Sequence, residues 1–240
     1  MPSDTPPFVP RVRPPGQHVV IAIDGPAASG KSSTARWVAE QLGYRHVDSG
    51  ALYRAATAAR ARHGDAFGGW TEASVLDAAR VVRLAPRATS FVPLVADADV
   101  EEEIRGAEVT RAVSRVAQMP AVRAWVNEQV RATRAGHDVV VDGRDIGTAV
   151  FPDADLKIFL VADPWERARR RLVQRLGRRP ADAEIAAETE RIVQRDASDA
   201  TQTAQAKDAV LIDTTYLTQA EQVGRIVALA RAVTRHPDAT

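Results

Sequence analysis

The segment GPAASGKS, from Gly25 to Ser32, has the residue types and the spacing of a loop that binds nucleotide phosphates. It matches G-x-x-x-x-G-K-[ST] and lies between a β-branched run and a stretch with helical spacing, as that pattern requires. Its glycines allow a tight turn whose backbone N–H groups face phosphate oxygens, its lysine reaches the β- and γ-phosphates, and its serine hydroxyl binds Mg²⁺. The segment therefore predicts a nucleoside triphosphate site with Ser32 as metal ligand, formed by Gly25, Pro26, Ala27, Ala28, Ser29, Gly30, Lys31, Ser32 and Ser33.

A phosphate loop alone is compatible with a GTPase switch, an ATPase motor or a small-molecule kinase, which need different accompanying residues. The chain lacks the guanine-reading tetrapeptide N-K-x-D and, at 240 residues, is too short for most motor modules. These observations favour a kinase with a second pocket for its acceptor.

The elements that must position this loop alternate between short apolar runs and stretches with helical spacing. Continuous apolar runs are typical of buried strands, and their alternation with helices predicts a parallel sheet covered on both faces. The length allows one substantial core, so we expect one α/β domain over residues 18–235. The expected strands are HVVIAID (18–24), VVVDG (139–143), LKIFLVA (156–162) and AVLID (209–213).

Three segments depart from this alternation. Residues 80–104 have short alternating runs with turn residues, which predicts a small antiparallel insertion. Residues 163–195 are expected to form two consecutive helices, the first with Asp163 as N-cap and Pro164 at its first position. Residues 1–17 are rich in proline and lack periodic apolar residues, which predicts a disordered or extended arm.

Composition excludes several classes of protein. The 32 basic and 31 acidic residues give a net charge of +1, which disfavours a general nucleic-acid binder. The absence of cysteine excludes disulfides, thiolate metal sites and thiol redox chemistry. No apolar run approaches the roughly 20 residues of a membrane-spanning helix, and the first residues lack the apolar centre of a signal peptide. We therefore expect a cytoplasmic protein that does not bind membranes.

Two further segments carry a specific resemblance. HVDSGALYRA (46–55) and VVDGRDIGTAVFPDADLKIFL (140–160) closely resemble the bacterial cytidylate kinase family, and weaker matches occur at 98–123 and 195–200. The resemblance implies a P-loop kinase that transfers the γ-phosphate of ATP to CMP or dCMP with Mg²⁺. It also implies a three-layer fold with a nucleoside monophosphate (NMP) binding insertion at about 65–125 and a helical lid at about 163–198. We expect a monomer.

The resemblance assigns an acceptor site to two groups of residues. Arginines neutralise the acceptor phosphate, and a forked guanidinium suits that task. A carboxylate that accepts from the cytosine amino group and an arginine that donates to N3 and O2 would discriminate against uracil by roughly 10⁴-fold. The implied residues are Arg54 and Arg144 for phosphate, Ser114, Arg123 and Asp145 for the base, and Ser49, Arg195 and Asp199 for other contacts with CMP.

Each of these residues also has an ordinary structural interpretation. Arg144 and Asp145 could form a local ion pair in a surface turn, and Arg54 could be an ordinary exposed arginine. Asp142, at the end of a strand, could hold Mg²⁺ waters or merely cap a helix or turn. His46 is expected to be a structural histidine because the acceptor phosphate is already ionised and transfer needs no general base. Packing is the expected role of Trp37, Trp70, Trp125 and Trp165.

The helix expected after Asp163 is rich in arginine. Arg167, Arg170 and Arg171 share one face of this helix. In the resembling kinases, lid arginines stabilise the transferring phosphoryl group. The resemblance therefore makes Arg167 and Arg171 candidate catalytic residues, with Lys31 and Arg144. The alternative is a solvated face paired with the acidic second helix.

The chain also departs from the family it resembles. The family usually has an arginine three residues after the position of Asp199, where this chain has Gln202, and the next strand comes about four residues sooner. Either a phosphate contact is missing or Lys207 replaces it. Two other functions remain open: a kinase of another acceptor, such as UMP, AMP or dephospho-coenzyme A, and a non-catalytic regulatory protein that binds a nucleoside triphosphate.

Overall fold

A mostly parallel sheet forms the centre of the computed structural model, which describes residues 17–234. Within that range the sheet has eight strands in the order β3-β4-β2-β6-β1-β7-β8, and β5 pairs with β4. Only the β3–β4 and β4–β5 pairs are antiparallel. The strands are β1 (Val20–Asp24), β2 (Arg45–Asp48), β3 (Val82–Pro86), β4 (Ser90–Val95), β5 (Ala98–Asp99), β6 (Val139–Gly143), β7 (Leu156–Val161) and β8 (Val210–Asp213).

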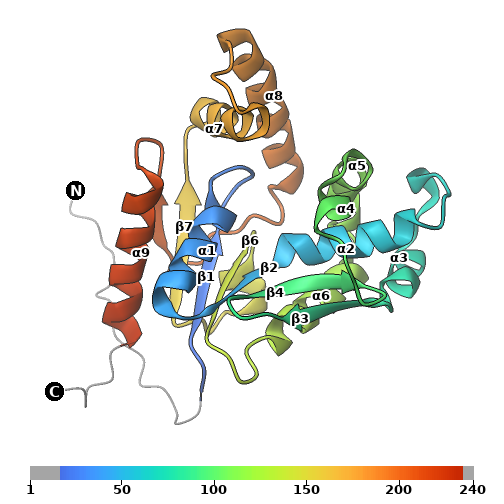
Figure 1. Cartoon of the computed structure of the whole chain (residues 1–240), viewed down its shortest axis with the longest axis horizontal. Helices are drawn as coiled ribbons and strands as arrows, with labels where there is room; N and C mark the ends of the chain where they lie inside the picture. The colour runs from blue at the N-terminus through green and yellow to red at the C-terminus, as the bar shows by residue number, and fades with distance from the viewer. Residues whose placement is uncertain (1–16, 235–240) are drawn as a thin grey trace.

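Helices cover both faces of this sheet (Figure 1). The α-helices are α1 (Lys31–Leu42), α2 (Ser49–Ala61), α3 (Glu72–Ala79), α4 (Glu101–Arg105), α5 (Ala107–Val116), α6 (Pro120–Ala132), α7 (Pro164–Leu176), α8 (Asp182–Asp199) and α9 (Gln219–Thr234). A 3₁₀ turn η1 (Phe67–Gly69) and a π turn η2 (Ile146–Val150) complete the described elements.

Alternate residues of β1 point into two separate cores. Val20 and Ala22 pack with α2, α3, α5 and α6 on one face, whereas Ile21 and Ile23 pack with α1 and α9 on the other. Every β1 residue is buried because side chains on both faces are covered, which explains its continuous apolar sequence. The expected three-layer α/β fold is confirmed.

The predicted strands and insertion correspond closely to the structure. Each of the four expected core strands is present within two residues of its predicted bounds. The segment at 80–104 forms an antiparallel hairpin, but β4 also pairs in parallel with β2, so the insertion extends the central sheet instead of standing apart from it.

The two helices α7 and α8 project beyond the carboxyl ends of the strands (Figure 1). Asp163 caps α7 as predicted, because its side chain accepts from the backbone N–H groups of Trp165 and Glu166. A small core of their own, formed by Ala168, Leu172, Ile185 and Ile192, holds the two helices together.

The packing prediction for the tryptophans is only half right. Trp70 is buried and Trp125 packs against the larger core. Trp37 and Trp165 are 52% and 38% exposed, so the prediction is wrong for both. Trp37 lies on the face of α1 away from its buried residues, whereas Trp165 shares the face of Ala168 and Leu172 but stays partly exposed near the start of α7, beside Pro180 and Ile185.

The predicted proline-rich arm lies outside the described residues apart from Gln17. Within residues 17–234, none of the helices has both the length and the apolar character needed to cross a membrane.

Candidate active site

The loop between β1 and α1 has the geometry of a phosphate cradle. Gly25 follows β1 with a φ of 152°, and a Cβ there would lie 2.3 Å from the carbonyl oxygen of Leu160, so only glycine fits. Gly30 is the N-cap of α1 and has a left-handed conformation, and no side chain caps the first turn. The buried Oγ of Ser29 has no hydrogen-bond partner. Free donors at a helix N-terminus fit the oxygens of a phosphate group.

Lys31 is buried at the base of this loop. Its Nζ donates to the carbonyl oxygen of Pro26 at 2.9 Å. Burial, reinforced by the charge of Arg144, lowers the pKa of Lys31 to about 7. The charges of Asp142 and Asp48 oppose this fall only in part, so an incoming phosphate would add counter-charge and the site favours an anionic ligand.

Asp142, the fourth residue of β6, faces the loop. Ser32 Oγ donates to its Oδ2 at 2.5 Å, and Nε2 of His46 lies 2.7 Å from its Oδ1. Burial alone would raise the pKa of Asp142, but the hydrogen bond and charge of His46, with the bond from Ser32, hold it below its usual range. The carboxylate is therefore ionised beside the phosphate loop and caps neither a helix nor a turn. His46 is a buried histidine with a hydrogen-bond partner, as predicted.

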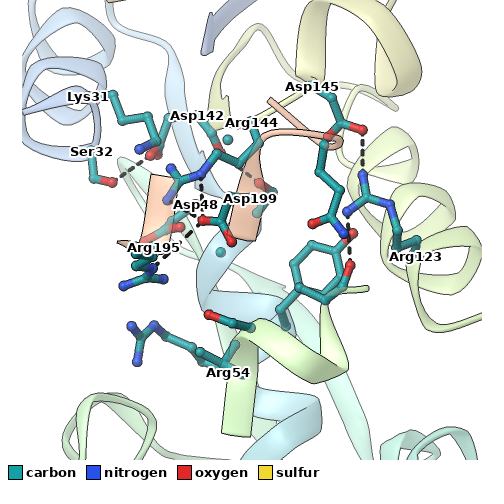
Figure 2. A pocket seen from close by; sticks show the side chains of 18 of the residues that line it. Lys31, Ser32, Asp48, Arg54, Arg123, Asp142, Arg144, Asp145, Arg195 and Asp199 are labelled. Atoms are coloured by element: carbon teal, nitrogen blue, oxygen red, sulfur yellow. Dashed lines mark hydrogen bonds and ion pairs between the residues drawn. The ribbon is translucent and has the colours of Figure 1, made fainter. Parts of the chain in front are cut away.

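A cavity of about 240 Å³ begins at this point and extends between α2, α5 and α8 (Figure 2). It brings together residues that are as much as 171 positions apart in the sequence, from Lys31 to Gln202. The predicted site residues that line it are Lys31, Ser32, Ser49, Arg54, Ser114, Arg123, Arg144, Asp145, Arg195 and Asp199.

One side of the cavity is a cluster of cations around Asp199 (Figure 2). Nε and Nη2 of Arg144 lie 3.3 and 3.2 Å from Asp199 Oδ2, and Nη1 donates to the carbonyl oxygen of Gly25 at 3.1 Å. Arg195 reaches the same carboxylate at 3.7 Å. Burial and the charge of Arg195 lower the pKa of Arg54 to about 10. Because Arg54, Arg144 and Arg195 outnumber the carboxylates Asp48 and Asp199 at this end of the cavity, the cluster can accept an additional anion.

The other side of the cavity carries the pair Arg123 and Asp145 (Figure 2). Arg123 Nη2 donates to Asp145 Oδ2, and Nη1 donates to the carbonyl oxygen of Ala117 at 3.1 Å. The guanidinium of Arg123 lies over the ring of Tyr53, 5.9 Å from its centroid. Both ion-pair partners line the cavity, so a bound molecule can share this donor and acceptor. The alternative of a local Arg144–Asp145 pair is not what the structure has, because Arg144 pairs with Asp199 and Asp145 with Arg123.

The arginines of α7 that were predicted as catalytic do not line this cavity. Arg167 is buried, and its Nη1 donates to the carbonyl oxygen of Ala27 at 2.8 Å and to Asp196 at 2.6 Å. Arg171 pairs with the buried Glu188 of α8 at 3.2 Å. For Arg171 the structure therefore has the expected alternative, a pair with the acidic second helix. Arg167 instead connects α7 to the phosphate loop.

The predicted set does not contain every residue of the cavity, and Asp48 is among the polar residues it missed. Tyr53, Arg105 and Gln202 line it, whereas Lys207 is exposed and does not line it. Tyr53 lies within the characteristic HVDSGALYRA segment and Arg105 within the weaker match at 98–123, so the same resemblance could have indicated both. Of the phosphate-loop residues, only Lys31 and Ser32 reach the cavity.

The phosphate loop after β1, the three-layer parallel sheet and the second cavity beside Lys31 define the class of the molecule as a nucleotide-binding P-loop kinase. Comparison with known proteins identifies the family to which the chain belongs. The family model described as cytidylate kinase matches residues 21–232, and the chain belongs to the cytidylate kinase family.

Curated relatives agree over almost their whole length. The cytidylate kinase of Pelotomaculum thermopropionicum is 42% identical over 217 residues, which cover 88% of this chain and 96% of that protein. The cytidylate kinase of Geobacillus kaustophilus is 44% identical over 220 residues, covering 89% and 96%. That of Chloroherpeton thalassium is 40% identical over 228 residues, covering 90% and 95%.

Proposed function

We propose that this chain transfers the γ-phosphate of ATP to CMP or dCMP, giving ADP and CDP or dCDP, in pyrimidine nucleotide metabolism. The observation that carries the proposal is a single cavity that joins Lys31 to a cationic cluster at one end and to the Arg123–Asp145 pair at the other. A donor phosphate, an acceptor phosphate and a base would each meet groups of matching chemistry there.

The donor side follows from the phosphate loop. ATP is the phosphate donor that membership of the family implies. The free N–H groups at the start of α1, the unpartnered Ser29 Oγ and the buried Lys31 ammonium match the oxygens of its β- and γ-phosphates. Ser32 Oγ and, through water, the ionised Asp142 carboxylate would hold Mg²⁺. The ion would neutralise charge on the transferring phosphoryl group.

Arg123 and Asp145, which here hydrogen-bond to each other, would recognise the acceptor base. Cytosine offers an amino donor to Asp145 and ring acceptors to Arg123, so both side chains exchange one partner for another of the same type. Uracil presents the opposite donor and acceptor at these positions, and the buried groups would be left unpaired. Ser114 and Tyr53 line the same part of the cavity.

The acceptor phosphate would lie against Arg54, Arg144 and Arg195. Arg144 also donates to the carbonyl oxygen of Gly25, so it would lie between the two substrates and could stabilise charge on both. Ser49 donates its Oγ to the Asp142 carbonyl and holds that turn in place. No general base is needed, because positioning in line and neutralisation of charge suffice.

We propose that residues 163–198 act as a lid and residues 65–125 as the acceptor-binding insertion. Arg171 would leave Glu188 and reach the transferring phosphoryl group when the lid closes. Arg167 would act differently from the sequence prediction, by holding the Ala27 carbonyl and so the shape of the phosphate loop.

Product analysis tests the proposal directly. The protein is incubated with ATP, Mg²⁺ and one of CMP, dCMP, UMP or AMP, and the diphosphates are separated by chromatography, with Lys31→Met as the inactive control. We expect CDP and dCDP as main products. Equal use of UMP or AMP would favour the kinase of another acceptor, and no product with any acceptor would favour the regulatory protein. Sedimentation velocity of the same sample tests the predicted monomer.

A further inference from the structure

Asp24, the last residue of β1, has a role that sequence patterns did not indicate. Its carboxylate is buried, with 4% of the residue exposed, and it does not line the cavity. Oδ1 accepts from the backbone N–H of Ile146 and Oδ2 from that of Gly147, both at 2.8 Å. A single side chain therefore connects the strand that leads into the phosphate loop with the segment that follows β6.

That segment is the turn carrying Arg144 and Asp145. Asp145 has φ −144° and ψ 30°, outside the helical and strand regions, so local backbone preference does not fix the turn. Gly147 permits a close approach, because a Cβ there would lie 3.2 Å from Lys157 and 3.5 Å from Asp24 Oδ2. Asp24 accepts hydrogen bonds from the backbone of the turn, and Arg144 of the same turn donates to the Gly25 carbonyl.

The burial of this carboxylate is costly. Burial, with a smaller contribution from the charge of Asp145, raises the pKa of Asp24 to about 6, although the two N–H groups and Lys31 oppose the rise. The charged groups around it are Lys31 of α1, Arg144 and Asp145 of the turn, and Lys157 of β7. A group that is costly to ionise but accepts two buried N–H bonds is typical of a site where geometry matters more than stability.

We propose that Asp24 is a positioning residue that fixes the acceptor turn against the phosphate loop, so that Arg144 and Asp145 meet CMP where the ATP phosphate can reach it. The inference rests on the proposed function, since it assigns Arg144 and Asp145 to the acceptor. It adds a residue that contacts neither substrate.

The test compares Asp24→Asn with Asp138→Asn. The asparagine keeps the size but turns an amide nitrogen toward one of the two N–H groups, which then loses its acceptor. Asp138 is a matched control, because its carboxylate accepts from Val19 N–H at 2.6 Å beside the opposite end of β1. Dissociation constants for CMP and for Mg²⁺-ATP are measured separately by calorimetry, together with kcat and both KM values.

We expect Asp24→Asn to weaken CMP binding by about 10- to 100-fold, the size of an unsatisfied buried N–H, while ATP binding changes by less than about twofold. The kcat should fall, and Asp138→Asn should leave all these values unchanged. Equal losses for CMP and ATP, or no loss at all, would overturn the inference. If the wild-type protein neither binds nor phosphorylates CMP, the proposed function fails instead.

A measurement on the wild-type protein covers the case in which Asp24→Asn does not fold. Cytidine has the base without the titrating phosphate, and its binding is followed by NMR between about pH 5 and pH 8. Protonated Asp24 can accept only one of the two N–H bonds, so cytidine affinity should weaken as the pH falls below about 6. A flat affinity over this range would contradict the proposal.

Discussion

The acceptor turn and the lid are held in place by different kinds of interaction. The turn after β6 is fixed by buried bonds: Asp24 accepts from Ile146 and Gly147, and Ser49 donates to Asp142. The lid helices expose most of their ion pairs. Arg171, Arg175 and Arg191 are 36%, 54% and 69% exposed and converge on Glu188.

This difference separates the two tasks that phosphate transfer sets. The acceptor must be held in one place, and buried hydrogen bonds provide a fixed geometry because breaking any of them leaves an unsatisfied polar group. The proposed lid would have to open and close, and arginines that are themselves solvent-exposed and lie 3.2–3.8 Å from Glu188 could exchange this carboxylate for a phosphate. Under the proposed function, the acceptor turn would be preorganised, whereas the arginines of α7 would change partners.

The largest loss is expected from removing the arginine that links the two substrates. Arg144→Ala removes a cation that reaches both Gly25 and Asp199, so kcat/KM for CMP should fall by about 10³-fold. Steady-state kinetics measure this, and circular dichroism checks the fold. A loss under about tenfold would mean that the turn does not carry catalysis.

A smaller loss of activity is expected from substitutions in the lid, and only for Arg171, not for Arg175. Arg171→Ala should lower kcat by about 10²-fold if Arg171 reaches the phosphoryl group on closure. Arg175→Ala, one helical turn further on and 3.8 Å from Glu188, should change kcat by less than about threefold. Equal effects of the two substitutions would contradict a specific role for Arg171.

Removing the internal counter-charge of the lid should have the opposite sign. Glu188→Gln leaves the arginines free to bind phosphate, so the KM for ATP should fall by about two- to fivefold, a small change because the arginine partners are solvent-exposed although Glu188 is buried. High salt should reduce the difference between variant and wild type. An increase in this KM would show that Glu188 orients the arginines and does not compete for them.

The smallest effect concerns stability and pH. Because the pKa of Asp24 is about 6 in the folded protein and 3.8 ordinarily, the native state binds more protons between these values than the unfolded chain. The stability that Asp24 contributes is present below about pH 3.8 and is lost as the pH rises through about 6. The Tm of the wild type should therefore fall relative to that of Asp24→Asn between about pH 4 and pH 6.5. Parallel curves for the two proteins would contradict the raised pKa.

The same two regions differ in how much of their structure could be predicted from the sequence. The phosphate loop, the core strands and the turn after β6 could be predicted because their residues are contiguous and each local pattern has few other uses. The partners of the lid arginines could not be predicted, since several arginines on one helix beside several acidic residues on the next allow many pairings. The contacts of Asp24 with Gly147 and of Arg167 with Ala27 join positions 123 and 140 residues apart, which no local pattern encodes.

The most direct measurement of the central claim is the ratio of kcat/KM for CMP to that for UMP, in the wild type and in Asp145→Ala. The acceptor cavity predicts a ratio of roughly 10⁴ for the wild type, because uracil leaves Arg123 and Asp145 unpaired. Without the carboxylate the variant should lose most of that preference. Equal use of CMP and UMP by the wild type, or an unchanged ratio in the variant, would contradict the account.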